Sequence, residues 1–451
     1  MQDGTQTPQG QAAKRSRREP AARLARDWAA GAALAAIMAA SLPALAAPDA
    51  RGDGAGARLA APAAAQAEPR AVTNAVSVTG DNRVTILGFT ISRPVEARAF
   101  VMERPDRAVI ELPEVNFQLP QGSGRRGKGL AASFRYGVFA PGKSRIVIDL
   151  AAPATVTRVT TVQQENALPR LEIEITRADR PHFHKEARLA AGQGAGQAPP
   201  PAAVAPADKA DRRPVIVLDP GHGGLDNGAI NSAGLVEKDI VLAFAQRLRE
   251  HLEATGRYRV IMTREGDAFV PLGDRVRIAQ QHRAALFLSV HADILRESPG
   301  VRGATVYTGS KLATDTESAQ LADKENDADR AAGVTAQVDN DQVANILLDL
   351  TMRETRAFSN VLATKLVGGL GQVIRMNKNP HRSARFIVLT APDTPSALLE
   401  IGYLSSTRDA DLMNSPEWRD RTTAALAKAI NQYFDGRRSM TAPMTAPGNI
   451  P

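Results

Sequence analysis

The feature that most limits the fold of this chain is the alternation of apolar runs, glycine-rich turns and amphipathic stretches after Pro214. Residues 215–218 form a continuous apolar run, and largely apolar runs recur at 260–262, 286–290 and 397–399. Apolar residues also recur at helical spacing, namely Ile240, Phe244, Leu248 and Leu252. Strands that are apolar throughout are typical of parallel sheets with both faces covered. The pattern predicts an α/β catalytic domain, a mostly parallel twisted sheet with helices on both faces.

A different sequence pattern precedes this region, between residues 72 and 178. Short runs there are rich in β-branched residues and alternate apolar with polar positions, at 76–78, 84–87, 108–112, 145–150 and 171–175. Short alternating strands at this spacing predict a small all-β sandwich domain.

The sequence predicts that three segments are connections or tails. Residues 47–71 form an Ala/Gly/Pro spacer, residues 179–213 a Pro/Ala/Gly linker, and residues 437–451 a disordered tail after a folded region 214–436. His182 and His184 lie at the start of the linker, where solvated side chains are the favoured interpretation and metal ligation the alternative.

Residues 1–46 have the layout of a signal peptide. Six basic residues precede an alanine-rich apolar run at 29–40, and the small-residue motif at 44–46 follows. The run is too short for a good membrane span, so we expect cleavage near Ala46, export to the periplasm and no permanent membrane anchor. The pair Arg17-Arg18 leaves the choice between the general and the twin-arginine export route open.

The amino-acid composition limits which metal sites and which partners this chain can have. The chain has no cysteine, which excludes disulfides, iron–sulfur clusters and thiolate zinc sites and leaves His, Asp and Glu as strong metal ligands. A net charge of +8 favours acidic partners, but it does not distinguish a nucleic-acid partner from an anionic cell wall. Only 4% of the residues are aromatic, few for base stacking, so no nucleic-acid partner is expected.

Polar residues directly follow three of the apolar runs, where ligands bind in open α/β sheets. These residues are His222, His291 and Glu400. Glu237 lies in the first turn of the expected helix, where a carboxylate also has a structural explanation, since it complements the helix dipole. Two histidines with one carboxylate are the ligand set of catalytic zinc sites that keep an open position. A phosphate-binding loop at 219–224 is disfavoured, because no Gly-Lys-Ser/Thr follows it.

Five ordered blocks over residues 214–436 carry a family resemblance: VIVLDPGHGGLDNGAI, GLVEKDIVLAFAQRL, MTREGDAFVPLGDRVRIA, LFLSVHAD and APDTPSALLEIGYLSS. They resemble the zinc-dependent N-acetylmuramoyl-L-alanine amidases of the cell-division type. The β-rich segment, with FRYG at 134–137 and RIVIDL at 145–150, resembles the AMIN domain that often precedes them. Together the two regions resemble a periplasmic, AmiC-like architecture.

The resemblance implies that His222, Glu237 and His291 bind Zn²⁺ and that Glu400 is the catalytic carboxylate. The implied reaction is hydrolysis of the amide between the lactyl group of N-acetylmuramic acid and the L-alanine of the stem peptide, during daughter-cell separation. Glu400 would take a proton from water and give it to the departing amine. Asn227 and Gln280 depart from the family's usual proline and asparagine, and neither is an implied ligand.

An acidic, alanine-rich stretch lies within residues 311–356. Its composition alone favours a solvated helix or loop. In similar division amidases an inserted helix covers the active site and offers a glutamate to the zinc, until an activator with a LytM domain releases it. The resemblance makes Glu325 the candidate autoinhibitory residue.

A second class of function stays open at this point, a non-catalytic peptidoglycan-binding division scaffold with a vestigial metal site. The sandwich domain carries no catalytic constellation of its own, and the basic run at 125–128 is either a contact for an acidic polymer or a solvated loop. A zinc measurement together with dye release from sacculi distinguishes enzyme from scaffold.

Overall fold

The computed structural model describes residues 70–120, 122–140, 142–163, 167–193, 195, 211–295, 300–334 and 346–441. The expected signal peptide and most of the spacer lie outside these residues. The described parts form an all-β domain and an α/β domain. None of the helices in the described parts combines the length and the apolar character needed to cross a membrane.

The all-β domain, called the sandwich domain below, contains two sheets. The first has the order β5-β1-β2-β9-β8, with bounds Val115–Phe117, Ala71–Gly80, Val84–Ile91, Arg170–Arg177 and Ala154–Val162. The second has the order β3-β4-β7-β6, with bounds Arg98–Met102, Arg107–Pro113, Lys143–Leu150 and Ala131–Ala140.

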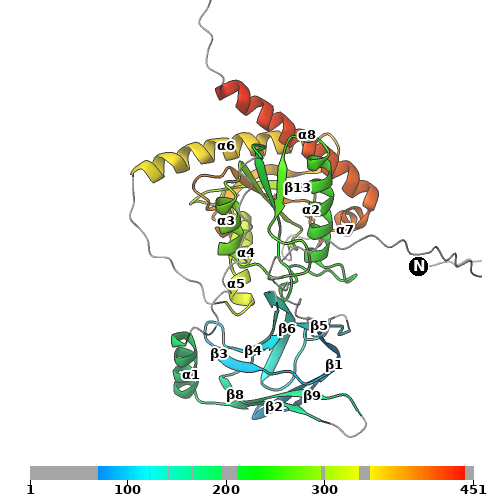
Figure 1. The fold of residues 1–451 in the computed structure, drawn as a ribbon, viewed down its shortest axis with the longest axis vertical. Coiled ribbons are helices and arrows are strands. Elements are labelled where there is room, and N and C mark those ends of the chain that lie inside the picture. The colour runs from blue at the N-terminus through cyan, green and yellow to red at the C-terminus, as the bar shows by residue number, and fades with distance from the viewer. Residues whose placement is uncertain are drawn as a thin grey trace, which may run out of the picture. The chain divides into compact units, whose positions relative to one another are not determined.

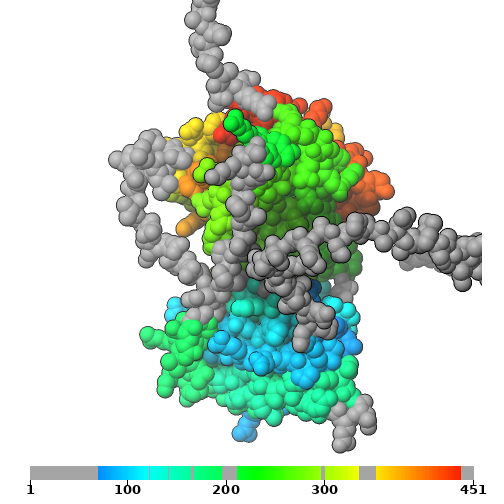
Figure 2. All heavy atoms as spheres, viewed as in Figure 1, coloured from blue at the N-terminus to red at the C-terminus, as the bar shows by residue number. Residues whose placement is uncertain are grey.

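The core of the sandwich domain lies between these sheets. Strand β9 shows the alternation clearly, because Leu171, Ile173 and Ile175 are buried while the glutamates between them are partly exposed. The same core includes Phe89 of β2 and Ile148 of β7, one from each sheet. In the space-filling view the domain that these strands form, blue through cyan to blue-green, is one closely packed body (Figure 2). The predicted β-sandwich is therefore confirmed.

One prediction within the linker is wrong. Residues 179–213 were expected to form an irregular connection, but helix α1 occupies Arg180–Gly192. Asp179 caps its N-terminus by accepting a hydrogen bond from the His182 N–H at 2.7 Å. The helix is ordered because Phe183 is fully buried and joins the sandwich core, which the Pro/Ala-rich composition concealed.

The α/β domain is built on a six-stranded sheet in the order β11-β10-β12-β15-β13-β14. Four neighbouring pairs are parallel, and only β13 and β15 pair in the antiparallel sense. The predicted mostly parallel sheet is confirmed. The strand bounds, in the order of the sheet, are Arg259–Met262, Val215–Pro220, Leu286–His291, Ser396–Glu400, Ala304–Gly309 and Met376–Ala384.

Helices cover both faces of this sheet, as predicted. Helices α2 (Glu237–Glu253), α6 (Ile346–Leu370) and α8 (Pro416–Thr441) pack on one face. Helices α3 (Leu272–Gln281) and α4 (Thr316–Asn326) pack on the other, and Figure 1 shows α2 and α3 on opposite sides of the strands. The smaller helices are α5 (Ala328–Ala331), α7 (Thr407–Asn414) and the 3₁₀ turn η1 (Ile387–Leu389).

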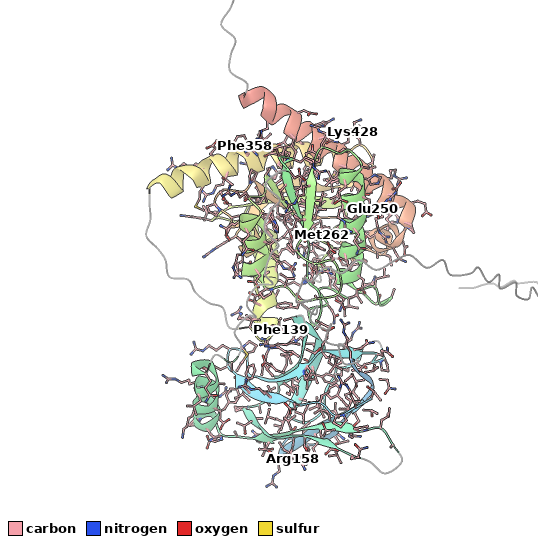
Figure 3. The ribbon with its side chains drawn as sticks, viewed as in Figure 1. Phe139, Arg158, Glu250, Met262, Phe358 and Lys428 are labelled. Atoms are coloured by element: carbon pink, nitrogen blue, oxygen red, sulfur yellow. The ribbon has the colours of Figure 1, made fainter. Side chains whose placement is uncertain are left out.

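The side chains follow this layering. Figure 3 shows Met262 inside the layer between sheet and helices and Glu250 on α2. Met262 is buried, whereas Glu250 and Lys428 of α8 are exposed. The central strands β12 and β15 are buried along their whole length, which explains why their sequences are apolar on both faces.

Two expected boundaries differ from the structure. The inserted segment was expected to end at residue 356, but α6 continues through this position to Leu370. The tail was expected to begin at residue 437, but α8 continues to Thr441.

Candidate metal centre

The first wall of the site is the turn after β10. His222 adopts a left-handed backbone conformation with φ of 59°, which costs a non-glycine residue about 1–2 kcal/mol. The turn must be narrow, since a Cβ added to Gly221 would lie 2.4 Å from the His291 ring. At Gly228, a Cβ would lie 2.6 Å from the His222 ring, so small residues let the chain close around these side chains.

Glu237 is the first residue of α2, as predicted, and its side chain is fully buried. Its two oxygens accept hydrogen bonds from the N–H groups of Ala229 and Ala292, both at 2.8 Å. These bonds fix the carboxylate between the turn after β10 and the end of β12. A structural role in the helix dipole would not require this inward, fully buried position.

His291 and Glu400 lie side by side because β12 and β15 are parallel neighbours whose register pairs these two residues. Both side chains leave the carboxyl ends of their strands and are buried. One oxygen of Glu400 accepts a hydrogen bond from the Asp293 N–H at 3.0 Å. The other oxygen has no hydrogen-bond partner within the described part of the chain.

Three of the predicted residues converge on one point. His222 Nε2 lies 3.1 Å from Glu237 Oε1, and His291 Nδ1 lies 3.3 Å from the same oxygen. Ligand atoms from His222, Glu237 and His291 all lie within 4.8 Å of one another, and among the described residues this is the group that can hold a metal ion. Neither converging imidazole nitrogen makes a hydrogen bond to a described residue. Two buried, unpartnered imidazole nitrogens beside a carboxylate fit a metal ion.

The electrostatics of the site favour a positive charge at this point. Burial lowers the pKa of His222, but the facing carboxylates, Asp226 first among them, more than offset this and raise it well above its usual value. Burial raises the pKa of Glu237, but the two imidazoles outweigh burial and hold it well below its usual value. The carboxylates thus stabilise a cation between them, whether a proton or a metal ion.

Glu400 has the opposite electrostatic setting. Burial raises its pKa, and the nearby carboxylates of Asp293 and Glu237 raise it further, well above the usual range of a glutamate. A raised pKa favours the protonated carboxyl group, a shift that is common in glutamates that act as general acids and bases.

Helix α4 brings a further carboxylate to the centre. Glu325, the candidate named from the sequence, is buried, and its Oε2 lies 3.4 Å from His222 Nε2 and 3.2 Å from His291 Nδ1. The preceding residue, Lys324, forms an ion pair with Asp293. The following residue, Asn326, donates to the Arg385 carbonyl at 2.7 Å and accepts from the Ile387 N–H at 2.8 Å.

The structure brings the predicted residues His222, Glu237, His291, Glu400 and Glu325 together. His184 instead contacts Glu103 on the sandwich domain, and His182 is exposed there. Of the other histidines, His251 contacts Asp420 on the helical face of the α/β domain.

Sequence reasoning missed several supporting residues. Asp226 faces His222 Nδ1 at 2.9 Å and orients the imidazole ring. Two buried arginines, Arg264 and Arg275, donate hydrogen bonds to the turn that carries His222. Asp226 could have been found from the sequence, because a carboxylate four residues after a histidine in a glycine-rich turn can reach the imidazole ring. Nothing in the sequence marks the two arginines as part of the site.

Comparison with known proteins identifies relatives of this chain. Residues 216–432 match the family model described as N-acetylmuramoyl-L-alanine amidase. The N-acetylmuramoyl-L-alanine amidase AmiC of Neisseria meningitidis serogroup B is 40% identical over 225 residues, which are 50% of this chain and 53% of that protein. The N-acetylmuramoyl-L-alanine amidase AmiC of Escherichia coli O6:H1 is 30% identical over 378 residues, which are 80% of this chain and 89% of that protein.

Among solved structures, the N-acetylmuramoyl-L-alanine amidase AmiC2 of Nostoc punctiforme is 26% identical, with a TM-score of 0.36. That match covers 49% of this chain and 97% of the solved chain. The chain spans about half the length of the Neisseria relative and most of the length of the Escherichia relative. The similarity to AmiC of Escherichia coli, which extends over most of both proteins, shows that this chain belongs to the N-acetylmuramoyl-L-alanine amidase family.

Proposed function

We propose that this protein is a zinc-dependent peptidoglycan hydrolase that cleaves the amide between the lactyl group of N-acetylmuramic acid and the L-alanine of the stem peptide. The observation that carries the proposal is the convergence of His222, Glu237 and His291 beside the buried Glu400. The names of the relatives support the choice of bond, since they specify the muramoyl-alanine amide. The intact set of four side chains speaks against a scaffold with a vestigial site.

His222, Glu237 and His291 are the residues that would hold Zn²⁺. When bound there, Zn²⁺ supplies a Lewis acid for the amide carbonyl and lowers the pKa of water toward about 7. The chain supplies the rest of the arrangement. Asp226 keeps His222 Nε2 turned toward the centre, and two backbone N–H groups keep Glu237 in place.

Glu400 would move the proton. It accepts one from the attacking water and passes it to the departing amine, because an amine anion is too poor a leaving group to depart unprotonated. The hydrogen bond from the Asp293 N–H holds one of its oxygens, which leaves the unpartnered oxygen to face the reacting groups. The raised pKa of Glu400 suits a carboxyl group that must retain a proton between the two transfers.

Helix α4 would keep the enzyme inactive. With Glu325 Oε2 within 3.4 Å of both imidazole nitrogens, the carboxylate occupies the space that water and the substrate carbonyl need. Activity then requires α4 to leave the site, and an activator with a LytM domain is the proposed partner that displaces it.

The proposed setting is the periplasm during daughter-cell separation, with peptidoglycan as the substrate and no nucleic-acid partner. Export would depend on residues 1–46, and the sandwich domain would serve binding or septal targeting.

Product analysis tests this function. Purified sacculi are digested with a variant that lacks residues 315–345, and the soluble products are identified by mass spectrometry. We expect stem peptides with a free L-alanine N-terminus and glycan strands that keep the lactyl group. His291→Ala in the same deletion background is the control and should yield no such products. Cleavage at any other bond, or binding to sacculi without cleavage, would contradict the proposal.

A further inference from the structure

The turn that carries His222 lies outside any helix or extended strand and is held by a few backbone hydrogen bonds, such as Gly223 N–H to the Asp226 carbonyl at 2.8 Å, and by buried side chains. After β10 ends at Pro220, the chain enters no helix or extended strand until α2 begins at Glu237. Within the turn, His222 has a φ of 59°, a conformation that an L-amino acid adopts in a folded protein only when its surroundings enforce it. The enforcing groups must therefore act on the backbone of this turn.

Arg275 of α3 is the first such group. Its Nη1 donates to the Pro220 carbonyl at 3.0 Å and its Nη2 donates to the His222 carbonyl at 2.8 Å. Arg275 is 2% exposed, and its guanidinium group is paired with the fully buried Asp219, whose Oδ1 lies 2.8 Å from Nη1. The planar fork thus spans the two carbonyl groups on either side of Gly221.

Arg264, which follows β11, completes the set. Its Nε donates to the Pro220 carbonyl at 3.0 Å, and its Nη2 donates to the Gly221 and Lys238 carbonyls, both at 2.8 Å. The carbonyl groups of three consecutive residues, 220–222, therefore all accept hydrogen bonds from buried guanidinium groups. Arg264 also ties this turn to the first turn of α2, where Glu237 lies.

We propose that Arg275 and Arg264 are positioning residues that set the metal affinity of this site by fixing the backbone of the His222 turn. The inference rests on the metal centre of the proposed function. Both guanidinium groups donate to backbone carbonyls of the turn, so their effect on the ligand atoms passes through the peptide backbone of 220–222. Asp226 orients the imidazole ring, whereas the arginines place the residue that carries it.

Arg275→Lys in the full chain tests this role. Lysine keeps the positive charge beside Asp219, but its single ammonium group cannot replace a planar fork that reaches two carbonyl groups. We expect the dissociation constant for Zn²⁺, measured by competition with a chromophoric chelator, to rise about 10- to 100-fold. In the metal-free protein, the ring resonance of His222 in an NMR spectrum should broaden or split as the turn samples other conformations.

Leu366→Ala is the matched control for a loss of stability alone. Leu366 lies fully buried on α6 in the main core of the domain, and its apolar side chain cannot hold the turn by hydrogen bonds. This variant should lower the Tm through a cavity while its Zn²⁺ affinity stays within about twofold of the wild type. If both variants lose Zn²⁺ affinity equally for the same loss of Tm, or if Arg275→Lys keeps wild-type affinity, the positioning role is wrong.

Arg264→Lys keeps the inference testable if the first variant does not fold. It spares the His222 carbonyl and should therefore weaken Zn²⁺ binding less than Arg275→Lys, by about tenfold. Wild-type affinity in a folded Arg264→Lys protein would count against the proposal. A wild-type chain that binds no Zn²⁺ would instead contradict the metal centre of the proposed function, which separates the two failures.

Discussion

At the scale of single residues, two buried glutamates in one site have opposite acid–base properties. Burial raises the pKa of both Glu237 and Glu400. Glu237 faces the imidazoles of His222 and His291, which outweigh burial, so its pKa falls well below the usual value. Glu400 faces other carboxylates, of which Asp293 has the largest effect, so its pKa rises. One residue is suited to remain ionised as a ligand and the other to carry a proton.

Glu400→Gln should therefore separate catalysis from structure. Glutamine keeps the shape and can still accept the hydrogen bond from the Asp293 N–H, but it cannot take a proton. We expect turnover to fall by roughly 10²- to 10⁴-fold, with the Zn²⁺ content unchanged and the free energy of unfolding changed by less than about 1 kcal/mol. Dye release from sacculi measures turnover, in a Glu325→Gln background so that α4 does not mask the effect.

His291→Ala in the same background is the matched comparison for Glu400→Gln. It removes an imidazole nitrogen from the centre and should lower the Zn²⁺ content itself. Near-normal cleavage by the Glu400→Gln protein would remove Glu400 from the mechanism.

The residues at the centre could be predicted because strand ends are visible in a sequence. His222, His291 and Glu400 each follow an apolar run, and parallel strands bring their carboxyl ends together. Arg264 and Arg275 could not be found in this way, since an arginine in a turn or an amphipathic helix is normally solvated. Their role depends on which carbonyl groups the fold leaves without partners, and this is a property of the folded turn.

At the scale of elements, α4 is held in the site at several points along its length. Its N-terminus is capped by Asp315, and Glu317 pairs with Arg382 at 2.8 Å. At its other end Glu325 faces the imidazoles while the flanking residues contact neighbouring segments. Leu321 and Ala322 of α4 also pack in the apolar cluster on this face of the sheet, so release of the helix must break apolar as well as polar contacts.

Glu325→Gln should raise basal activity. The neutral amide loses the attraction of the carboxylate to the cationic centre, and the blocked state becomes less populated. We expect basal dye release to increase about tenfold or more, since about 1.4 kcal/mol corresponds to a factor of ten. Asp323→Asn is the matched control, because Asp323 is an exposed carboxylate on the same helix. Equal basal rates for wild type, Glu325→Gln and a protein that lacks residues 315–345 would show that α4 does not inhibit.

Asn326→Ala tests how the end of α4 is held. The change removes two hydrogen bonds to the backbone of residues 385–387, each worth about 1 kcal/mol. We expect a severalfold rise in basal activity and faster hydrogen exchange at the amides of α4, measured by mass spectrometry. Gln320→Ala removes an exposed amide side chain from the same helix and should change neither quantity. Unchanged exchange in the Asn326→Ala protein would contradict this account of the contact.

Helices and strands with a clear apolar periodicity could be predicted from the sequence. Elements whose sequence is set by their place in the fold, such as an edge strand or a helix with little buried surface, could not. Strand β14 has the sequence MNKNPHRSA and lies at the edge of the sheet, where polar residues and a proline are tolerated and no apolar run is needed. Helix α1 was hidden because only Phe183 and Ala187 of its residues are buried. A helix with so narrow an apolar contact resembles a solvated linker in sequence.

At the scale of the whole molecule, the described chain has one main apolar core in the sandwich domain and an apolar layer on each face of the α/β sheet. The core of the sandwich domain draws on residues between Ala71 and Ala187, and the main core of the α/β domain on residues between Ile216 and Phe434. The turn with His222, the strand ends with His291 and Glu400, and helix α4 all belong to the α/β domain. Chains of roughly 100 to 250 residues bury enough surface to fold alone.

A fragment of residues 211–441 should therefore fold and carry the complete chemistry. With Glu325→Gln, we expect it to bind Zn²⁺ and to cleave a soluble muramoyl-peptide within about twofold of the full chain that carries the same change, because every residue of the proposed mechanism lies within it. On intact sacculi it should be slower if the sandwich domain anchors the enzyme to the wall. Circular dichroism, Zn²⁺ content and the two cleavage rates check these points. A folded, zinc-loaded fragment that fails on the soluble substrate would mean that the sandwich domain contributes to the reaction itself, and the assignment of the chemistry to His222, Glu237, His291 and Glu400 alone would be wrong.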